Sequence, residues 1–245
     1  MKTLRQALAL CPLLIVAAQA ANTAMNPAEL AEVRRWSAAK FEGAQPAAVI
    51  EPALVVLANH GPVQKNARDD RPMHIVDSFY STEPPFSFVY GGKAPAELLK
   101  EWKCERAARK LDEHRTERSS VWTDPRTGLQ VRWVGIEYDD FPTVEWVVHF
   151  KNTSATDTPI LSDVQAVDLG LVRAGPGEFV LNHHAGDNCS PDSYEPRRLT
   201  LEPKSEHRFA PAGGRPTSVG FPYFNLEWAG EGLIIVIGWP GQWAA

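Results

Sequence analysis

Several features that identify common classes of protein are scarce or absent in this sequence. It has three cysteines in 245 residues, and neither their number nor their spacing matches a zinc site. Its 25 basic residues are outnumbered by 30 acidic ones, which argues against a nucleic-acid-binding surface. It contains no nucleophile elbow, phosphate-binding loop or zincin helix. The sequence therefore predicts no metal, no cofactor, no nucleic-acid partner and no complete catalytic site.

Long apolar runs are also missing, and the run near the N-terminus, from Ala7 to Ala18, is too short to span a bilayer comfortably. It follows the basic residues Lys2 and Arg5, and it leads into the small residues of Ala18-Gln19-Ala20. A basic start, a short apolar centre and small residues before a cleavage point are typical of a secretory signal peptide. We predict that residues 1–20 are removed and that the mature protein is secreted or periplasmic, with no membrane segment.

The next segment, residues 21–45, is predicted to form an N-terminal helix followed by a linker. Asn26-Pro27-Ala28-Glu29 combines a helix N-cap, a proline at the first helical position and an acidic residue in the first turn. Apolar side chains then recur at helical spacing from Leu30 to Trp36. We expect one amphipathic helix over residues 27–41.

From Gly43 onward, alternation of apolar and polar residues replaces the helical period, and prolines and glycines are frequent. The clearest predicted strands are Leu54–Ala58, His74–Tyr80, Phe86–Tyr90, Leu129–Tyr138, Val144–Phe150, Ile160–Val167, Glu178–Asn182 and Leu233–Trp239. A turn sequence at Thr123–Gly128 predicts a hairpin, and Ala94–Lys103 is the only other predicted helix. We therefore expect residues 46–245 to be all-β, an antiparallel β-sandwich of the supersandwich type with a short N-terminal helix before it.

The unbroken apolar run Leu233–Ile237 is typical of a strand that is buried on both faces, yet it lies close to Ala245. A central strand has neighbours on both sides. We therefore expect the sandwich domain to be truncated at its C-terminal end. Whether Cys104 and Cys189 pair in an oxidising compartment stays open at this point.

Two groups of polar residues could carry chemistry. Asp139-Asp140 and Glu145 invite comparison with the paired carboxyl groups of a glycosidase, but Tyr138–Pro142 is better interpreted as a turn between strands. The segment His183–Cys189 holds metal-ligand side chains, and we interpret it as a polar inter-strand loop. Adjacent histidines on a strand would point to opposite faces, so they could not both bind one ion without a bulge.

Aromatic residues cluster near the C-terminus, and indole faces stack well on the apolar faces of sugars. We assign Trp228 mainly to the core, whereas Trp239 and Trp243 fit a core role and a sugar platform equally well. Pro240-Gly241 permits a sharp turn that would hold an indole and the Gln242 amide outward. The candidate substrate-binding residues are therefore Trp239, Gln242 and Trp243.

Three stretches resemble motifs of the N-terminal domain of family 36 α-galactosidases, the melibiases. They are Tyr138-Asp139-Asp140-Phe141-Pro142-Thr143-Val144-Glu145-Trp146 with Phe150-Lys151-Asn152, then Gly213-Gly214-Arg215-Pro216-Thr217-Ser218 with Pro222-Tyr223-Phe224-Asn225-Leu226, and Leu233–Gly238 with Trp239-Pro240-Gly241-Gln242-Trp243. They are similar, in order and spacing, to that family's "Y-x-D-(Y/F)-P-x-(I/V)-E", "G-R-x-x-S", "N-P-F-F-A-L" and "Y-S-G-N-F" patterns. Phe221, Pro240 and Gln242 depart from the family's usual Asn, Ser and Asn.

The resemblance implies an N-terminal sandwich that precedes a (β/α)₈ barrel with two catalytic aspartates for retaining hydrolysis of α-galactosides. No barrel occurs in these residues, so no catalytic residue is carried over. The expected function is the non-catalytic sandwich part of an exported α-galactosidase-like hydrolase, which meets its carbohydrate through the adjoining barrel. A free-standing carbohydrate-binding module and a purely structural scaffold are the alternatives, and a homo-oligomer is left open.

Overall fold

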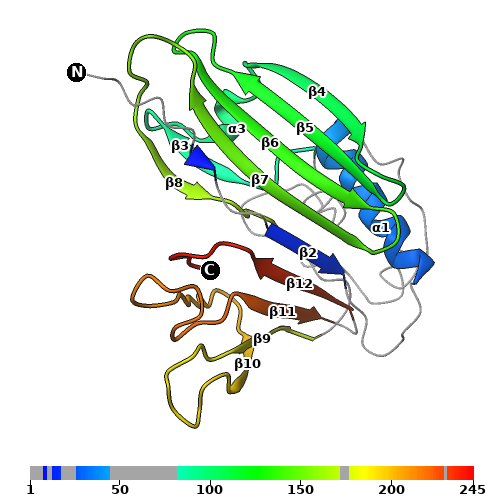
Figure 1. The fold of residues 1–245 in the computed structure, drawn as a ribbon, viewed down its shortest axis with the longest axis vertical. Coiled ribbons are helices and arrows are strands. Elements are labelled where there is room, and N and C mark those ends of the chain that lie inside the picture. The colour runs from blue at the N-terminus through cyan, green and yellow to red at the C-terminus, as the bar shows by residue number, and fades with distance from the viewer. Residues whose placement is uncertain (1–7, 10–12, 18–25, 45–81, 172–176, 229–230) are drawn as a thin grey trace.

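The computed structural model describes residues 8–9, 13–17, 26–44, 82–171, 177–228 and 231–245. Its main feature is a ten-stranded antiparallel sheet, in the order β10-β9-β11-β12-β2-β7-β6-β5-β4, with β1 paired to β7 (Figure 1). The strands are β1 (Leu8–Ala9), β2 (Leu13–Ala17), β4 (Lys103–Lys110), β5 (Arg115–Thr123), β6 (Leu129–Tyr138), β7 (Thr143–Asn152), β9 (Phe179–His184), β10 (Pro196–Leu201), β11 (Tyr223–Trp228) and β12 (Glu231–Ile237). The strands β3 (Ser87–Tyr90) and β8 (Leu161–Gln165) form a second, two-stranded sheet.

The molecule has an all-β antiparallel sandwich fold with a short N-terminal helix, so the predicted fold class is confirmed. We call β4–β7, the segments packed on them and the small sheet the framework half, and β9–β12 with their loops the loop half. Along β5, β6 and β7, more buried side chains on the inner face alternate with more exposed side chains on the outer face, as expected for strands that are covered on one side. This inner face packs on the helices and on β3 and β8, and the side chains between them form the main core.

The N-terminal helix was predicted over residues 27–41. In the structure α1 (Pro27–Ser37) begins where Asn26 Oδ1 accepts a hydrogen bond from the amide of Ala28, at 3.0 Å. The chain then continues as a one-turn π-helix, η1 (Ala38–Glu42). Phe41 of η1 stacks on Trp133 of β6 with ring centroids 3.8 Å apart. A Cβ at Gly135 would lie 2.1 Å from the Phe41 ring, so the missing side chain makes room for this contact.

The hairpin predicted at Thr123–Gly128 joins β5 to β6. Asp124 is 1% exposed, and its carboxylate accepts hydrogen bonds from the Arg126 amide at 3.0 Å and the Thr127 hydroxyl at 2.6 Å. Gly128 has φ +74°, a value that favours glycine. The turn chemistry of the sequence therefore predicts this connection correctly.

Three other predictions need correction or fall outside the described residues. The helix predicted over Ala94–Lys103 is much shorter: α3 spans Pro95–Leu98, and β4 already begins at Lys103. Strand β4 was not predicted, because its side chains are mostly exposed at the edge of the sheet and lack apolar alternation. The strands expected at Leu54–Ala58 and His74–Tyr80 lie outside the described residues.

The apolar run near the C-terminus forms β12, with β11 on one side and β2 on the other. Strand β2 also pairs with β7, so it joins the framework half to the loop half (Figure 1). Its residues belong to the predicted signal peptide, whose removal stays a prediction. Among the residues that the structure describes, no helix is long and apolar enough to cross a membrane.

Candidate functional site: the loop end of β9–β12

Two long connections of the loop half and the segment after β12 meet at one end of its sheet. Antiparallel pairing brings the end of β9, the start of β10, the start of β11 and the end of β12 to the same end of the sheet. Residues 185–195, 202–222 and 238–245 leave or enter the strands there. The connections are tied together by bridges between Ala185 and Gly220 and between Asp187 and Ser218, and by two 3.0 Å hydrogen bonds between the backbones of Phe209 and Ala245. The loops at this end of the sheet, which we call the loop cluster, are therefore joined to one another by backbone hydrogen bonds.

The turn Trp239–Trp243 lies within this cluster and packs on the preceding loop. The Trp243 indole is 8% exposed, and its Nε1 donates a hydrogen bond to the carbonyl of Pro216 at 2.7 Å. The Gln242 side-chain amide donates to the carbonyl of Pro211. Both of these predicted sugar-binding side chains therefore donate hydrogen bonds to the protein's own backbone, and the Trp243 indole is buried in the loop cluster.

Trp239 differs from Trp243 because 42% of its surface is exposed. Its ring lies over Gly241, where an added Cβ would be 2.7 Å from the indole Nε1. The glycine therefore lets the chain reverse directly beneath the indole. Of the three predicted substrate-binding residues, Trp239 is the one that presents a large aromatic surface to solvent, and the prediction that they bind sugar stays a prediction.

On one face of β9, His183 lies in an aromatic cluster. Its ring centroid is 4.8 Å from that of Phe209 and 5.3 Å from that of His207. Phe209 in turn contacts Phe224 and Trp243 edge to face. Burial, together with the nearby His207, Arg197 and His184, lowers the pKa of His183 below its ordinary value of 6.5. The His183 imidazole is therefore packed as a mainly neutral ring.

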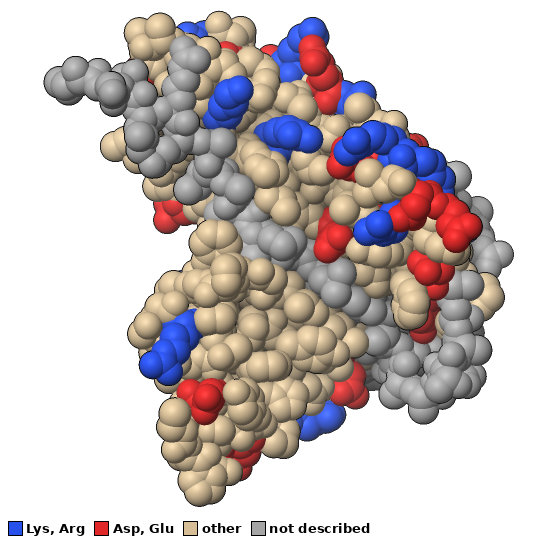
Figure 2. All heavy atoms as spheres, viewed as in Figure 1, with Lys and Arg blue, Asp and Glu red and all other residues tan. Residues whose placement is uncertain are grey.

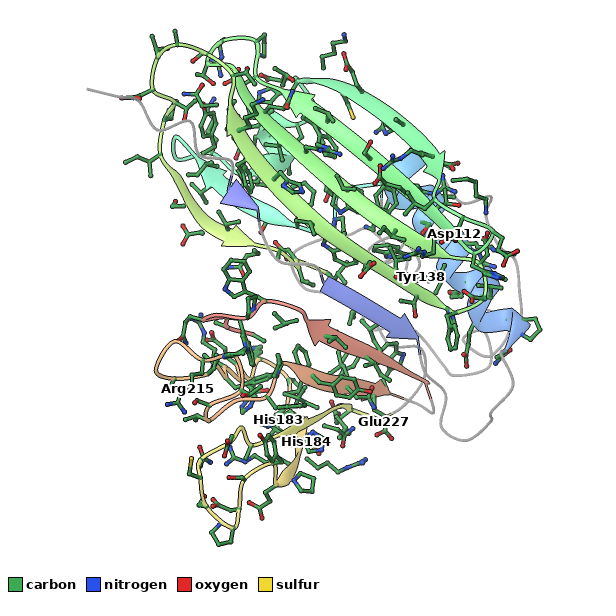
Figure 3. The ribbon with its side chains drawn as sticks, in the orientation of Figure 1. Asp112, Tyr138, His183, His184, Arg215 and Glu227 are labelled. Atoms are coloured by element: carbon green, nitrogen blue, oxygen red, sulfur yellow. The ribbon has the colours of Figure 1, made fainter. Side chains whose placement is uncertain are left out.

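The opposite face of the loop half is polar and more open. Asn182 of β9 donates to Glu227 of β11 at 3.1 Å, and Arg198 of β10 lies 3.4 Å from the same carboxylate. Asn225 is paired directly opposite Asn182, and its side-chain oxygen has no hydrogen-bond partner among the described residues. Figure 3 labels His183, His184 and Glu227 in this half of the molecule, with Arg215 on the neighbouring loop. An amide, a carboxylate and a guanidinium on one sheet face can donate to and accept from hydroxyl groups.

Sequence reasoning missed this polar network, because Asn182, Arg198 and Glu227 are far apart along the chain. Only the strand register brings them together, and neither β10 nor β11 was among the predicted strands. The loop prediction for His183–Cys189 was also partly wrong, since both histidines end β9. Their expected placement on opposite faces is confirmed, because His183 contacts Phe209 whereas His184 lies beside Phe221 with centroids 6.2 Å apart.

Two of the carboxylates around the β6–β7 connection are engaged by neighbouring side chains. Tyr138 donates a hydrogen bond to Glu145 at 2.9 Å. Asp139 forms ion pairs with Lys110 at 2.5 Å and Arg34 at 3.5 Å, and these cations hold its pKa below the ordinary value. The interpretation of this segment as a turn between two strands is confirmed.

The described residues contain no group of three or more histidine, cysteine or acidic side chains that could hold a metal ion. Cys104 on β4 and Cys189 in the loop after β9 are both free thiols, and burial raises the pKa of Cys104. Comparison with known proteins gives no relative: no family model, no curated protein and no solved structure matches this chain.

Proposed function

We propose that this chain is the non-catalytic sandwich part of an exported α-galactosidase-like glycoside hydrolase, and that its loop end packs on a (β/α)₈ barrel and walls the sugar pocket. In this proposal these residues form no part of the barrel and do not hydrolyse the sugar. In this proposal the framework half stabilises the domain, while the loop half faces the carbohydrate.

The proposal rests on one observation: stretches that resemble separate motifs of family 36 α-galactosidases meet in space. Gln242 and Trp243 of the turn after β12 hydrogen-bond to Pro211 and Pro216, around the Gly213–Ser218 loop. The backbone amide of Ile237 donates to Pro222 at 2.8 Å, which joins the turn to the start of β11. These contacts bring two of the three resembling stretches together, and the third, Tyr138–Asn152, lies on β6 and β7 in the framework half.

Trp239 supplies the chemistry that a sugar-facing wall needs. Its exposed indole offers an apolar face for the C–H groups of a pyranose ring, and the loops beneath it are fixed by hydrogen bonds. A rigid platform of this kind binds without a large cost in ordering its own side chain.

The proposal is tested by measuring the hydrolysis of an aryl α-galactoside by the complete gene product and its variants. Trp239→Ala should raise KM several-fold while the melting temperature stays nearly unchanged, and Trp239→Phe should restore much of the binding because it keeps an aromatic face. Trp243→Ala serves as the control for a buried role and should lower the melting temperature. Unchanged kinetics in Trp239→Ala would contradict the role proposed for this wall.

A free-standing carbohydrate-binding module is the second candidate, and the polar network of Asn182, Arg198 and Glu227 favours it. The two functions differ in what the chain does alone. Calorimetric titration of the chain with galactose and melibiose should show no tight binding if a barrel completes the pocket. Binding that is lost in Glu227→Gln, with no activity in the complete gene product, would support the module instead.

A further inference from the structure

Strand β2 occupies a slot in the middle of the main sheet. In the pairing with β12, Leu13 lies opposite Ile237 and Ala17 lies opposite Leu233. In the pairing with β7, Leu13 lies opposite Trp146 and Val16 lies opposite Thr143. Both pairings are antiparallel, so β7 and β12 run in the same direction with one strand between them (Figure 1). Among the described strands, β2 is what connects the two halves of the sheet.

The residues on both sides of the slot belong to the core. Val144 and Trp146 of β7 are 2% and 1% exposed, and Leu233 of β12 is 3% exposed. Ile235 and Ile237 pack against the same core cluster. An empty slot would therefore leave two rows of backbone N–H and C=O groups unpaired beside buried apolar side chains, which is costly in a folded protein.

The occupant of the slot is the apolar centre of the predicted signal peptide. If residues 1–20 are removed on export, the mature chain loses β2 and keeps both edges. Only an extended polypeptide segment can pair with two facing strand edges at once, and main-chain hydrogen bonds would supply much of its affinity. The sequence Leu13-Leu14-Ile15-Val16-Ala17 shows the chemistry that the slot accepts: at least five consecutive uncharged apolar residues without proline.

We propose that the edges of β7 and β12 form a strand-acceptor site, which in the exported protein takes an apolar strand from the rest of the hydrolase polypeptide, antiparallel to both edges. This inference rests on the proposed function for the source of the strand and on signal-peptide removal for the vacant slot. We assign the slot to a strand of the same polypeptide, because linkage gives it a far higher effective concentration than a free partner. In this arrangement β2 fills the slot in the precursor and a later strand replaces it.

The first experiment measures the slot itself. Residues 21–245 are titrated with a synthetic peptide that carries residues 13–17 between added lysines, and the whole chain of residues 1–245 serves as the control with its slot filled. We expect binding to residues 21–245 to be at least about tenfold tighter, and an Ile15→Pro version of the peptide to lose about tenfold, since proline removes a ladder hydrogen bond and fits poorly in a central strand. Equal binding by both proteins, or no effect of the proline, overturns the site.

A second variant covers the case in which residues 21–245 do not fold. The whole chain carrying Ile15→Pro keeps every other residue, and the same peptide should bind it at least about tenfold more tightly than the unsubstituted chain. Hydrogen exchange should show loss of protection at the amides of residues 143–146 and 233–237 that face the slot, every second residue on each strand, and its recovery with peptide, while the alternate amides that face β6 and β11 stay protected. Protection that does not change in the variant overturns the inference.

The source of the strand is tested on the exported complete gene product. The slot-facing amides of its residues 143–146 and 233–237 should be protected without added peptide, and it should not bind the peptide. Protection that appears only as the protein dimerises would overturn the assignment to the same polypeptide. Failure of the proposed function is separate, since it would appear as absent α-galactoside hydrolysis while the slot remains protected.

Discussion

The two halves of this molecule share one antiparallel sheet but bury their aromatic side chains to different extents. The framework half buries five tryptophans, namely Trp36, Trp102, Trp122, Trp133 and Trp146, each at most 6% exposed. In the loop half Trp228 is only partly buried and Trp239 is 42% exposed. Charged side chains gather over the framework half in Figure 2, whereas the visible face of the loop half is mainly uncharged. Deeply buried tryptophans are therefore concentrated in the framework half, and in the loop half Trp243, at 8% exposed, is the buried one.

The largest expected effect comes from removing a tryptophan of the framework half. Trp133 is fully buried and stacks on Phe41, so Trp133→Ala should lower the free energy of unfolding by about 3–5 kcal/mol. The matched change in the loop half, Trp239→Ala, should alter it by about 0.5 kcal/mol or less, because the indole is exposed. Urea unfolding of both variants measures the difference. Similar losses in the two variants would mean that the halves do not divide these roles.

Lys40 gives the framework half a distinctive response to alkaline pH. Its Nζ donates to the backbone carbonyl of Glu83 at 2.9 Å, and burial lowers its pKa from 10.5 to about 8 despite the attraction of Glu83. Between these values the unfolded chain binds more protons than the folded one, so stability should rise with pH, by about 3 kcal/mol at most.

Lys40→Met tests this response, because it keeps the length of the side chain without the charge. Denaturant unfolding on either side of the window should show a rise in the unsubstituted protein and little rise in the variant. Lys100→Met is the control, since the Lys100 side chain is 72% exposed while lying 3.9 Å from Glu83. A rise that survives in Lys40→Met would show that another group is responsible.

The framework half is also where the sequence predicts the structure best. Strand β6 was predicted with its observed bounds, because Val131 and Trp133 alternate with polar residues and the turn before them has clear turn chemistry. Strands β4, β5, β10 and β11 are not among the predicted strands. Strands β4 and β10 lie at the edges of the sheet and do not need an apolar face, whereas β5 and β11 lie inside the sheet and were missed although they have neighbours on both sides. The strand at residues 13–17 was read as the centre of a signal peptide, and local sequence cannot distinguish an apolar leader from an apolar strand.

For the candidate site, the sequence indicated the turn at Trp239–Trp243 but not the burial of its parts. The pattern alone gave Trp239 and Trp243 equal chances, and only the contacts of the preceding loop separate them. Trp243 finds a carbonyl acceptor at Pro216 and an aromatic neighbour in Phe209, whereas Trp239 turns back over Gly241. Such long-range contacts depend on how loops fold together, which periodicity and turn propensity do not encode.

The smallest expected effect is an acid response of the loop half, centred on His183. Burial and the neighbouring His207, Arg197 and His184 lower the pKa of His183, so below pH 6.5 the unfolded chain binds more protons at this residue than the folded chain. The contribution of His183 to stability should therefore fall as the pH decreases from 6.5 through its folded-state pKa. His183→Phe should reduce this acid sensitivity, because phenylalanine can pack beside Phe209 without binding a proton.

Arg197→Gln provides an intermediate case that separates charge from packing. Arg197 is paired directly opposite His183 and helps to lower its pKa, so its removal should raise that pKa and weaken the acid response while the imidazole remains in place. NMR titration of the His183 ring, combined with unfolding curves from neutral to acidic pH, measures both quantities. If the acid response is identical in the unsubstituted protein, Arg197→Gln and His183→Phe, then His183 does not cause it, and the loop half would have no acid response of its own to set against the alkaline response of Lys40 in the framework half.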